Sequence, residues 1–455
     1  MSTTITSAAA GALLVRPEDE GWDEARLAWN LAADQRPAAV ALPETADEVV
    51  AVVEHARAQG LHVAAQGTGH NAHPLTAHLD DTILVKTSRM RAVTVDPERR
   101  SARVEAGAAW GEVVAEVSTH GLTALSGSSH DVGVVGYCLG GGLSWLARKH
   151  GLCANNVLAI ELVTADGRLV RADHETEPEL FWALRGGGGN FGVVTAVELA
   201  LFDVATAYAG MLLWPIERAP EVLRAWRDWT ASAPEEVTTS ARLLNLPPLE
   251  QIPEIVRGRS FVAIDGAILG DPEQAAALLS PLRDLEPEID GFDTIPTYAL
   301  IHIHMDPPEP APGIGDGALV AELPDEAIDA MVAIGGAGSD SPLLMIELRQ
   351  LGGAVARPQE HHGALAAIAE PYAMFAVGMA MTPEMGAAVR AAIPEVKGAL
   401  GPWLSGRDYL NFAESAREDP AGFYADGVID RLRAAKAQYD PEDLFRGNHR
   451  ITPAA

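Results

Sequence analysis

The chain has 455 residues, of which 48% are hydrophobic, and its 33 Lys and Arg against 63 Asp and Glu give a formal net charge of −30. This length predicts two domains or one large two-part domain and excludes a single small module. The charge argues against nucleic acid or anionic lipid as the main partner, because binding to phosphates depends on basic clusters. No apolar run approaches the roughly 18 residues that a membrane span needs.

The N-terminal stretch MSTTITSAAAGALLV has a short apolar patch that no basic segment precedes, and the acidic RPEDEGWDEAR follows it. A secretory signal would need the basic segment, so we expect a cytoplasmic protein. The two cysteines, Cys138 and Cys153, are too few for a disulfide framework, and their spacing matches no zinc site.

Helices and short strands alternate over about the first 200 residues. Apolar residues at helical spacing predict helices over residues 46–60 and 110–121. Short alternating runs predict strands at LHVAA, DTILVKTS, AVTVD and ARVEAG. The run VLAIELVTADGRLVRA, residues 157–172, predicts a hairpin with Asp-Gly at its turn. This mixture of elements is typical of an α+β fold.

Residues 206–405 carry most of the prolines and alternate between strand-like and helix-like runs. Two of these runs, TYALIHIHMD at 297–306 and LLMIELRQLGG at 343–353, are predicted strands. Between them, PPEPAPGIGDG at 307–317 is predicted to be a loop, because prolines and glycines dominate it.

Glycine-rich stretches crowd residues 121–192, but none carries the signature of a common nucleotide site. GGGNFG lacks the acidic residue that follows a Rossmann fingerprint, and the chain has no Walker A sequence and no GxSxG elbow. Each loop by itself could be a tight turn. Together, such loops suit backbone N–H groups that lie close to a large, flat, anionic ligand such as a dinucleotide.

Four motifs follow one another along the chain: QGTGHN, DVGVVGYCLGGGLSWLARKHGLCANNVLAIELVTADG, ELFWALRGGGGNFGVVT and YDPEDLFRGNHRI. With them the chain resembles the FAD-linked oxidases of the vanillyl-alcohol oxidase (PCMH-type) fold, and more closely the berberine-bridge-enzyme-like branch of the bacterial 6-hydroxy-D-nicotine oxidase type. The resemblance implies a PCMH-type FAD-binding domain of two small α+β subdomains, formed by residues 1–205 and 406–455. It implies that residues 206–405 form a substrate domain whose antiparallel sheet is covered by helices.

The resemblance also implies FAD as the cofactor, with His70 joined through a ring nitrogen to the 8α-methyl group of the flavin. Without the surrounding motifs, a loop histidine would be interpreted as a solvated or capping residue. Ser129 stands where bicovalent relatives have a cysteine, so a second link is not expected. The residues at the positions of the family's other flavin contacts are Gly67, Thr68, Gly69, Asn71, Ser128, Ser129, Val132, Gly133, Gly136, Gly140, Gly141, Gly192, Val194 and Asn448. Thr68 stands where many relatives have Gly, and Gln66 stands where many have Arg, so one charged contact near the loop is missing.

Many relatives carry a Y-x-N-Y motif whose final tyrosine is the general base, and here the motif reads Tyr409-Leu410-Asn411-Phe412. Phe412 cannot accept a proton. An amine substrate can lose a hydride to flavin N5 from its neutral form without a strong base, so such a site needs polar groups that orient the substrate. Tyr409 and Asn411 are therefore catalytic candidates, and Phe412 is a candidate for lining the substrate site.

Strand alternation places Met345, Glu347 and Arg349 on one face. The family's strand at this point faces the flavin ring, so Glu347 and Arg349 are further catalytic candidates; the alternative is a salt-bridged surface strand. His302 and His304 share a face of the predicted strand at 297–306 and are candidates for lining the substrate pocket. A metal site there would need a third ligand, and none is evident.

The leading hypothesis is an FAD-dependent oxidase that takes a hydride from a C–N or C–O carbon of a small or secondary-metabolite substrate and reduces oxygen to hydrogen peroxide. The alternative is a flavoprotein dehydrogenase or a non-redox flavin-containing protein, because the terminal tyrosine is replaced. The expected partners are a small-molecule substrate and oxygen, without nucleic acid, membrane or metal, for a monomer or homodimer.

Overall fold

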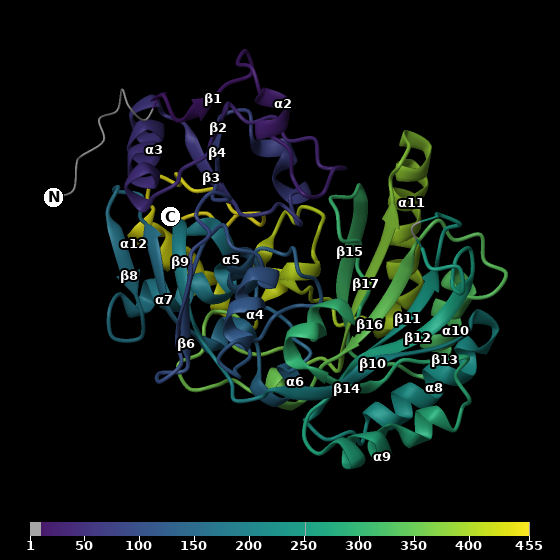
Figure 1. Cartoon of the computed structure of the whole chain (residues 1–455). Helices are drawn as coiled ribbons and strands as arrows, with labels where there is room; N and C mark the ends of the chain where they lie inside the picture. The colour runs from purple at the N-terminus through teal and green to yellow at the C-terminus, as the bar shows by residue number, and fades with distance from the viewer. Residues whose placement is uncertain (1–10, 251, 455) are drawn as a thin grey trace.

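The computed structural model describes residues 11–250 and 252–454 (Figure 1). These residues form three sheets, of four, five and eight strands, with helices packed against them. Most of the N-terminal stretch that led to the localisation prediction, residues 1–10, lies outside the described residues. Within the described part of the chain, no helix combines the length and the apolar character that crossing a bilayer requires.

The four-stranded sheet belongs to the N-terminal part of the chain and has the order β1-β2-β4-β3, formed by Leu14–Val15, Ala39–Ala41, Thr82–Lys86 and His62–Gln66. Helix α2 spans Trp22–Ala25, and helix α3 spans Ala46–Gln59. The Thr45 hydroxyl caps the start of α3 by accepting from the Glu48 amide, and Gly60, at a φ of 67°, ends it as predicted. The parallel pairing of β2, β4 and β3 leaves residues 67–71 at the carboxyl end of β3.

The five-stranded sheet is antiparallel and has the order β5-β6-β9-β7-β8, formed by Val93–Asp96, Ser101–Glu105, Val193–Ala200, Val157–Val163 and Leu169–Ala172. The predicted hairpin is β7 and β8, and Gly167 supplies the positive φ of its turn. The helices near this sheet are α4 (Trp110–Ser118), α5 (Val134–Leu139), α7 (Pro178–Gly187) and α12 (Val428–Tyr439), whereas α6 (Ala147–His150) contacts the eight-stranded sheet.

The eight-stranded sheet is antiparallel and comes from the middle of the chain: β13 (Ile289–Asp290), β10 (Thr206–Pro215), β12 (Ser260–Ile268), β11 (Val237–Asn245), β16 (Met345–Gln350), β17 (Tyr372–Met379) and β15 (Gly313–Val320), with β14 (Asp293–Pro296) beside β10. One of its faces packs against α8 (Ala219–Thr230), α9 (Pro272–Arg283), α10 (Asp325–Gly335) and α11 (Pro383–Leu400). The other face lies toward the first two sheets (Figure 1). The predicted α+β fold, with a helix-covered antiparallel sheet in the middle of the chain, is confirmed.

Two predictions for the middle of the chain are wrong. The run at 297–306 is not a strand, because Thr297–His302 form a 3-10 helix, η5, in which Leu300 and Ile301 are buried. Residues 307–317 are not entirely loop, because β15 begins at Gly313 and pairs with β17 from there. The other short 3-10 turns are η1 (His73–His78), η2 (Cys153–Asn156), η3 (Gly188–Asn190), η4 (Ile216–Arg218), η6 (Gly353–Ala356), η7 (Gly401–Trp403), η8 (Leu410–Phe412) and η9 (Pro420–Phe423).

The end of the chain returns to the first sheet. After α12, the backbone N–H of Val63 in β3 donates to Leu444 O (2.9 Å), and Arg446 N–H donates to Val63 O (2.8 Å). The C-terminal residues thereby lie beside the strand that carries residues 67–71 at its end.

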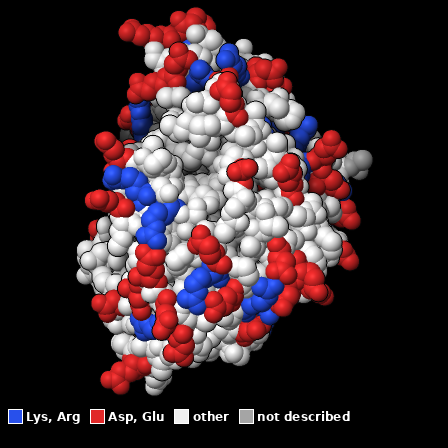
Figure 2. All heavy atoms as spheres, turned by 90° about the vertical axis from the view of Figure 1, so that its right-hand side faces the viewer, with Lys and Arg blue, Asp and Glu red and all other residues white. Residues whose placement is uncertain are grey.

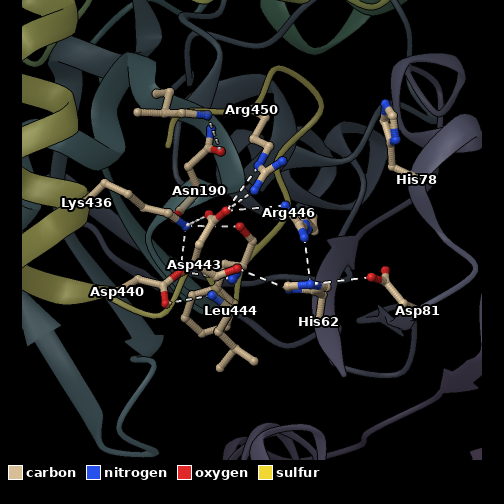
Figure 3. Close-up of polar contacts among 12 residues, drawn as sticks. His62, His78, Asp81, Asn190, Lys436, Asp440, Asp443, Leu444, Arg446 and Arg450 are labelled. Carbon is tan, nitrogen blue, oxygen red and sulfur yellow. Dashed lines mark hydrogen bonds and ion pairs between the residues drawn. The ribbon is translucent and has the colours of Figure 1, made fainter. Parts of the chain in front are cut away.

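A buried lysine holds this return in place (Figure 3). Lys436 Nζ is fully buried and donates to Asp440 Oδ2 (2.5 Å), Asn190 O (2.7 Å) and Phe445 O (3.0 Å). The Asp440 carboxylate also accepts from the backbone N–H groups of Leu444 (2.8 Å) and Phe445 (2.9 Å). One ammonium thus joins α12, η3 and the C-terminal segment.

Lys436→Met should destabilise the protein by about 3–5 kcal/mol, because it leaves the Asp440 carboxylate buried without its cation. The control is Arg357→Met, which removes an exposed ion pair with Glu235 and should cost at most about 1 kcal/mol. Urea unfolding curves measure both. Equal midpoints for the two variants would contradict the importance of the Lys436 contacts.

Candidate functional site

A cavity of about 330 Å³ lies where the two smaller sheets, the large sheet and the C-terminal segment meet. This volume falls in the range of small-molecule and cofactor sites. Its walls come from the loop after β3, from α5 and the loop before it, from η3, from β16 and η8, and from the C-terminal segment, residues 446–449.

The loop after β3 forms one wall with residues 66–71. Gly69 has a φ of 86°, and a Cβ there would lie 2.6 Å from Gln66 Nε2 and 2.9 Å from Ala28 Cβ. Only glycine fits this conformation and this space without strain. The tight turn places His70, the next residue, on the cavity wall.

The His70 imidazole is held between an aromatic ring and an aspartate. It stacks on Trp29 with 3.9 Å between ring centroids and 23° between planes, and its Nε2 lies 3.1 Å from the backbone O of Asp131. Burial lowers the pKa of His70, although the nearby Asp131 charge opposes this shift. The ring is therefore kept in its neutral form.

Two other parts of the wall leave open space beside glycine backbone. At Gly136 in α5 and Gly189 in η3, an added Cβ would meet no protein atom within 4 Å, although both residues line the cavity. Buried polar atoms on the walls also lack protein partners: Gln66 Nε2, Asn71 Oδ1, Tyr137 OH and His449 Nδ1. Open glycine backbone and unpartnered polar atoms fit a large cofactor with polar groups.

Hydrogen bonds connect the remaining segments around the cavity. Asn448 Nδ2 donates to Asn71 O (2.5 Å), Asn71 Nδ2 donates to Ala413 O (3.0 Å), and His449 Nε2 lies 3.2 Å from the same Ala413 O. Burial lowers the pKa of His449 to about 4, so its imidazole is neutral and donates through Nε2. Its Nδ1 is left as an acceptor beside the cavity.

Arg349 of β16 lies at another part of the wall. Its Nε donates to Glu347 Oε1 (2.8 Å), and its guanidinium carbon lies 5.2 Å from the ring centroid of Trp145 and 5.4 Å from that of Phe412. Both charged residues are buried, so the interpretation as a surface strand is wrong. Burial alone would lower the pKa of Arg349, but the carboxylates of Glu347, Asp265 and Asp306 together outweigh it, and the pKa is raised. The site therefore keeps a permanent cation between two aromatic rings.

Tyr409, Asn411 and Phe412 line the cavity near Arg349. Asn411 Nδ2 donates to Tyr137 O (3.0 Å) and to Tyr409 OH (3.3 Å), and Asn411 Oδ1 comes so close to Gly140 that a Cβ there would overlap it. Burial raises the pKa of Tyr409 well above its ordinary value. The Tyr409 phenol is consequently a hydrogen-bond donor rather than a proton acceptor.

Behind Glu347 lies a buried cluster of charges. His304 Nδ1 is 2.7 Å from Asp265 Oδ2, which also accepts from Arg242 NH2 (2.7 Å). Burial would raise the pKa of Asp265, but Arg242 and His304 lower it to about 2. His304 Nε2 points toward Glu347 Oε2 at 3.9 Å, whereas His302 is exposed and lies near His130. Among residues 11–250 and 252–454, no three His, Cys, Asp or Glu side chains are placed to hold a metal ion.

Most of the sequence-predicted cofactor residues meet at the cavity, including His70, Gly67, Thr68, Gly69, Asn71, Ser128, Val132, Gly133, Gly136, Gly140, Gly192, Val194 and Asn448. Ser129 and Gly141 lie outside its lining, as do Glu347, His302 and His304. The wall also contains Tyr137, residues 187–190, Arg446, Gly447 and His449, which sequence reasoning did not select. Two of these groups adjoin selected residues, in RGGGGNFG and GNHRI, so the full motifs could have indicated them.

Two family models match the chain. Residues 37–173 match the FAD binding domain, and residues 408–452 match the model described as berberine and berberine like. The first match contains the His70 loop and α5, and the second contains η8 and the cavity-lining residues 446–449.

Curated relatives match over nearly the full length. (R)-6-hydroxynicotine oxidase of Paenarthrobacter nicotinovorans is 28% identical, over 97% of this chain and 96% of the relative. Glucooligosaccharide oxidase of Sarocladium strictum is 26% identical, over 98% of this chain and 94% of the relative.

The solved structure of BBE-like 1 from Physcomitrella patens has the same fold, with a TM-score of 0.86 and 20% sequence identity over 99% of this chain and 98% of that one. The expected PCMH-type architecture is confirmed, and the cofactor is FAD. The chain therefore contains an FAD binding domain and a C-terminal berberine-like domain, and it is an FAD-dependent oxidoreductase similar to the berberine-bridge-enzyme-like proteins.

Proposed function

We propose that the protein is an FAD-dependent oxidase that takes a hydride from a C–N or C–O carbon of a small substrate and passes the electrons to oxygen. When bound, the flavin supplies N5 as the hydride acceptor and returns the electrons to oxygen, which gives hydrogen peroxide. The observation that carries the proposal is that one cavity contains both His70 with its glycine walls and the polar group of Arg349, Tyr409 and Asn411.

The lining residues are proposed to hold FAD, with His70 as the covalent attachment point. The open backbone at Gly136 and Gly189 leaves room for the cofactor, and the free acceptor and donor atoms of Asn71, Gln66 and His449 can bind its polar groups. Arg446, also on the wall, offers a positive charge to an anionic part of the cofactor. On this proposal residues 1–205 and 406–455 bind FAD, and residues 206–405 supply the substrate domain.

Arg349 is proposed to orient the substrate, with Glu347 fixing the direction of its guanidinium. The cation lies near the rings of Trp145 and Phe412, and Phe412 lines the cavity, so a flat or apolar substrate can contact the Phe412 ring while a polar atom accepts from Arg349. Tyr409 can donate a second hydrogen bond because its phenol stays protonated. These contacts select and position a substrate without removing a proton from it.

The proton acceptor of many relatives is missing, since Phe412 replaces a tyrosine. A substrate that reacts from its neutral form, such as an amine, does not need a strong base on the protein. The same replacement keeps a second candidate open, a flavoprotein dehydrogenase or a non-redox flavin-containing protein. Peroxide formation with oxygen separates the first candidate from the second.

The proposed partners are a small-molecule substrate and oxygen, for a cytoplasmic monomer or homodimer. Acidic side chains spread over the face shown in Figure 2, with basic ones standing among them. A surface of this kind repels phosphate backbones, which supports a function without nucleic acid.

His70→Ala should fold and bind FAD but release it on acid precipitation, because the covalent link is lost. The measurement is the flavin absorbance of pellet and supernatant, with the wild type as the reference. A yellow pellet from His70→Ala would contradict attachment at this residue.

Gly136→Leu should weaken FAD binding by about tenfold or more, because its side chain would fill cavity space at a cost of about 1–3 kcal/mol. Gly398→Leu is the matched control: Gly398 is also a helical glycine with no atom within 4 Å of an added Cβ, but it is exposed on α11. Flavin fluorescence titration of cofactor-free protein measures both. Equal affinity in the two variants would place the flavin elsewhere.

Glu347→Gln should lower kcat/KM by about 10- to 100-fold, because the Arg349 guanidinium loses a charged hydrogen bond worth about 1.5–3 kcal/mol. Flavin content should not change, since Glu347 lies outside the cavity lining. Glu235→Gln, in an exposed pair with Arg357, is the control. Peroxide formation by a panel of amines and alcohols supplies the assay, and wild-type kinetics in Glu347→Gln would remove this residue from the site.

A further inference from the structure

Trp29 lies outside every motif of the family resemblance, yet it is packed against the His70 loop. Its backbone N–H donates to Thr68 O (2.9 Å), and the next residue, Asn30, donates to Gly69 O (3.4 Å). Its indole covers the imidazole face with a centroid distance of 3.9 Å. The segment between α2 and β2 thus fixes the plane of the His70 ring.

Asp131 fixes the rotation of the ring within that plane. Its backbone carbonyl lies 3.1 Å from His70 Nε2, and a carbonyl oxygen can only accept a hydrogen bond. The hydrogen of the neutral imidazole is therefore on Nε2, and Nδ1 carries the free lone pair. Asp131 Oδ1 lies 3.5 Å from the same Nε2.

The Asp131 carboxylate is itself held by two donors. Trp29 Nε1 donates to Oδ2 (2.5 Å), and Ser129 Oγ donates to Oδ1 (2.8 Å). Trp29 therefore contacts the imidazole with its ring face and the carboxylate with its N–H. Ser129, which lies outside the cavity lining, therefore supports His70 through Asp131.

We propose that Trp29 and Asp131 are positioning residues that prepare His70 to bond to the flavin through Nδ1, with Asp131 balancing the positive charge that attachment creates on the imidazole. The inference rests on the covalent attachment at His70 proposed above. It adds the two side chains that orient the imidazole and hold the balancing charge.

The attachment reaction shows why a carboxylate is needed. The Nδ1 lone pair forms the C–N bond to the 8α carbon, and the methyl group gives up one proton. The two electrons of the broken C–H bond pass to oxygen by way of the flavin, and with the methyl proton and one solvent proton they yield hydrogen peroxide. The imidazole keeps its Nε2 hydrogen and becomes a cation.

The cation would form on the buried imidazole of His70. Burial disfavours a charged His70, and Asp131 is the largest influence that opposes burial. A carboxylate 3.5 Å from Nε2 stabilises the imidazolium as it forms, and two hydrogen bonds prevent the carboxylate from turning away. Asp306 also acts on His70, but its carboxylate binds Ser128 Oγ at 3.2 Å.

The test compares the rate at which added FAD becomes acid-stable in cofactor-free wild type, Asp131→Asn, Trp29→Phe and Asp306→Asn. Asp131→Asn keeps the shape but removes the charge, and attachment should slow by about tenfold or more. Trp29→Phe keeps an aromatic ring but loses the N–H, and it should slow attachment by a smaller factor. Asp306 is a nearby charge that does not contact His70, so Asp306→Asn is the control, and its attachment rate should stay within about twofold of the wild-type rate.

Total bound flavin, measured by fluorescence before precipitation, reports folding and cofactor binding independently of attachment. Wild-type rates in both Asp131→Asn and Trp29→Phe would overturn the positioning role, and so would an equal loss in Asp306→Asn. NMR of the flavin peptide from wild-type protein should locate the bond at Nδ1; a bond at Nε2 would overturn the assignment of the nitrogen. A wild-type pellet without flavin would overturn both this inference and the covalent attachment proposed above.

Discussion

The ammonium of Lys436 is the interaction on which the cavity depends. It is buried with Asp440 and donates to backbone oxygens of η3 and of the C-terminal segment, so three parts of the chain share one charge. The glycines of η3 and residues 446–449 form parts of the cavity wall. A wall with open glycine backbone can lie close to a flat cofactor only when other interactions fix it, and this ion pair holds η3 and the C-terminal segment together.

Local sequence patterns predicted the elements of the N-terminal part well. Helix α3 has its Thr cap, its apolar stripe and its Gly end within one stretch, and the β7–β8 hairpin has Asp-Gly at its turn. The strand prediction for residues 297–306 was wrong because apolar and polar residues alternate there over only a short distance. Over such a distance, periodicity does not distinguish a strand from a tight helix. The loop prediction for residues 307–317 failed from Gly313 onward because these residues pair with β17. The β15 glycines leave space for Phe375 and Phe412.

The motifs predicted a large part of the cavity wall, because glycine loops and the histidine loop are local features. They could not indicate Trp29, which lies outside every motif, nor the contact of Asp131 with His70. They also could not indicate the Arg242–Asp265–His304 cluster, because its members come together only when β11, β12 and the loop after η5 pack. Alternation along β16 did predict that Glu347 and Arg349 share a face, and their hydrogen bond agrees with it. The polar residues that support the site thus come together mostly in the tertiary structure, whereas those that line it belong mostly to local sequence motifs.

On our proposal, His70 and Arg349 belong to one flavin-dependent oxidase site, and a crystal structure of the FAD-loaded protein would test this. We expect continuous electron density from His70 Nδ1 to the 8α carbon, with the isoalloxazine ring extending toward Arg349 and Tyr409. An isoalloxazine ring that lies away from both His70 and Arg349, or a flavin outside this cavity, would contradict it.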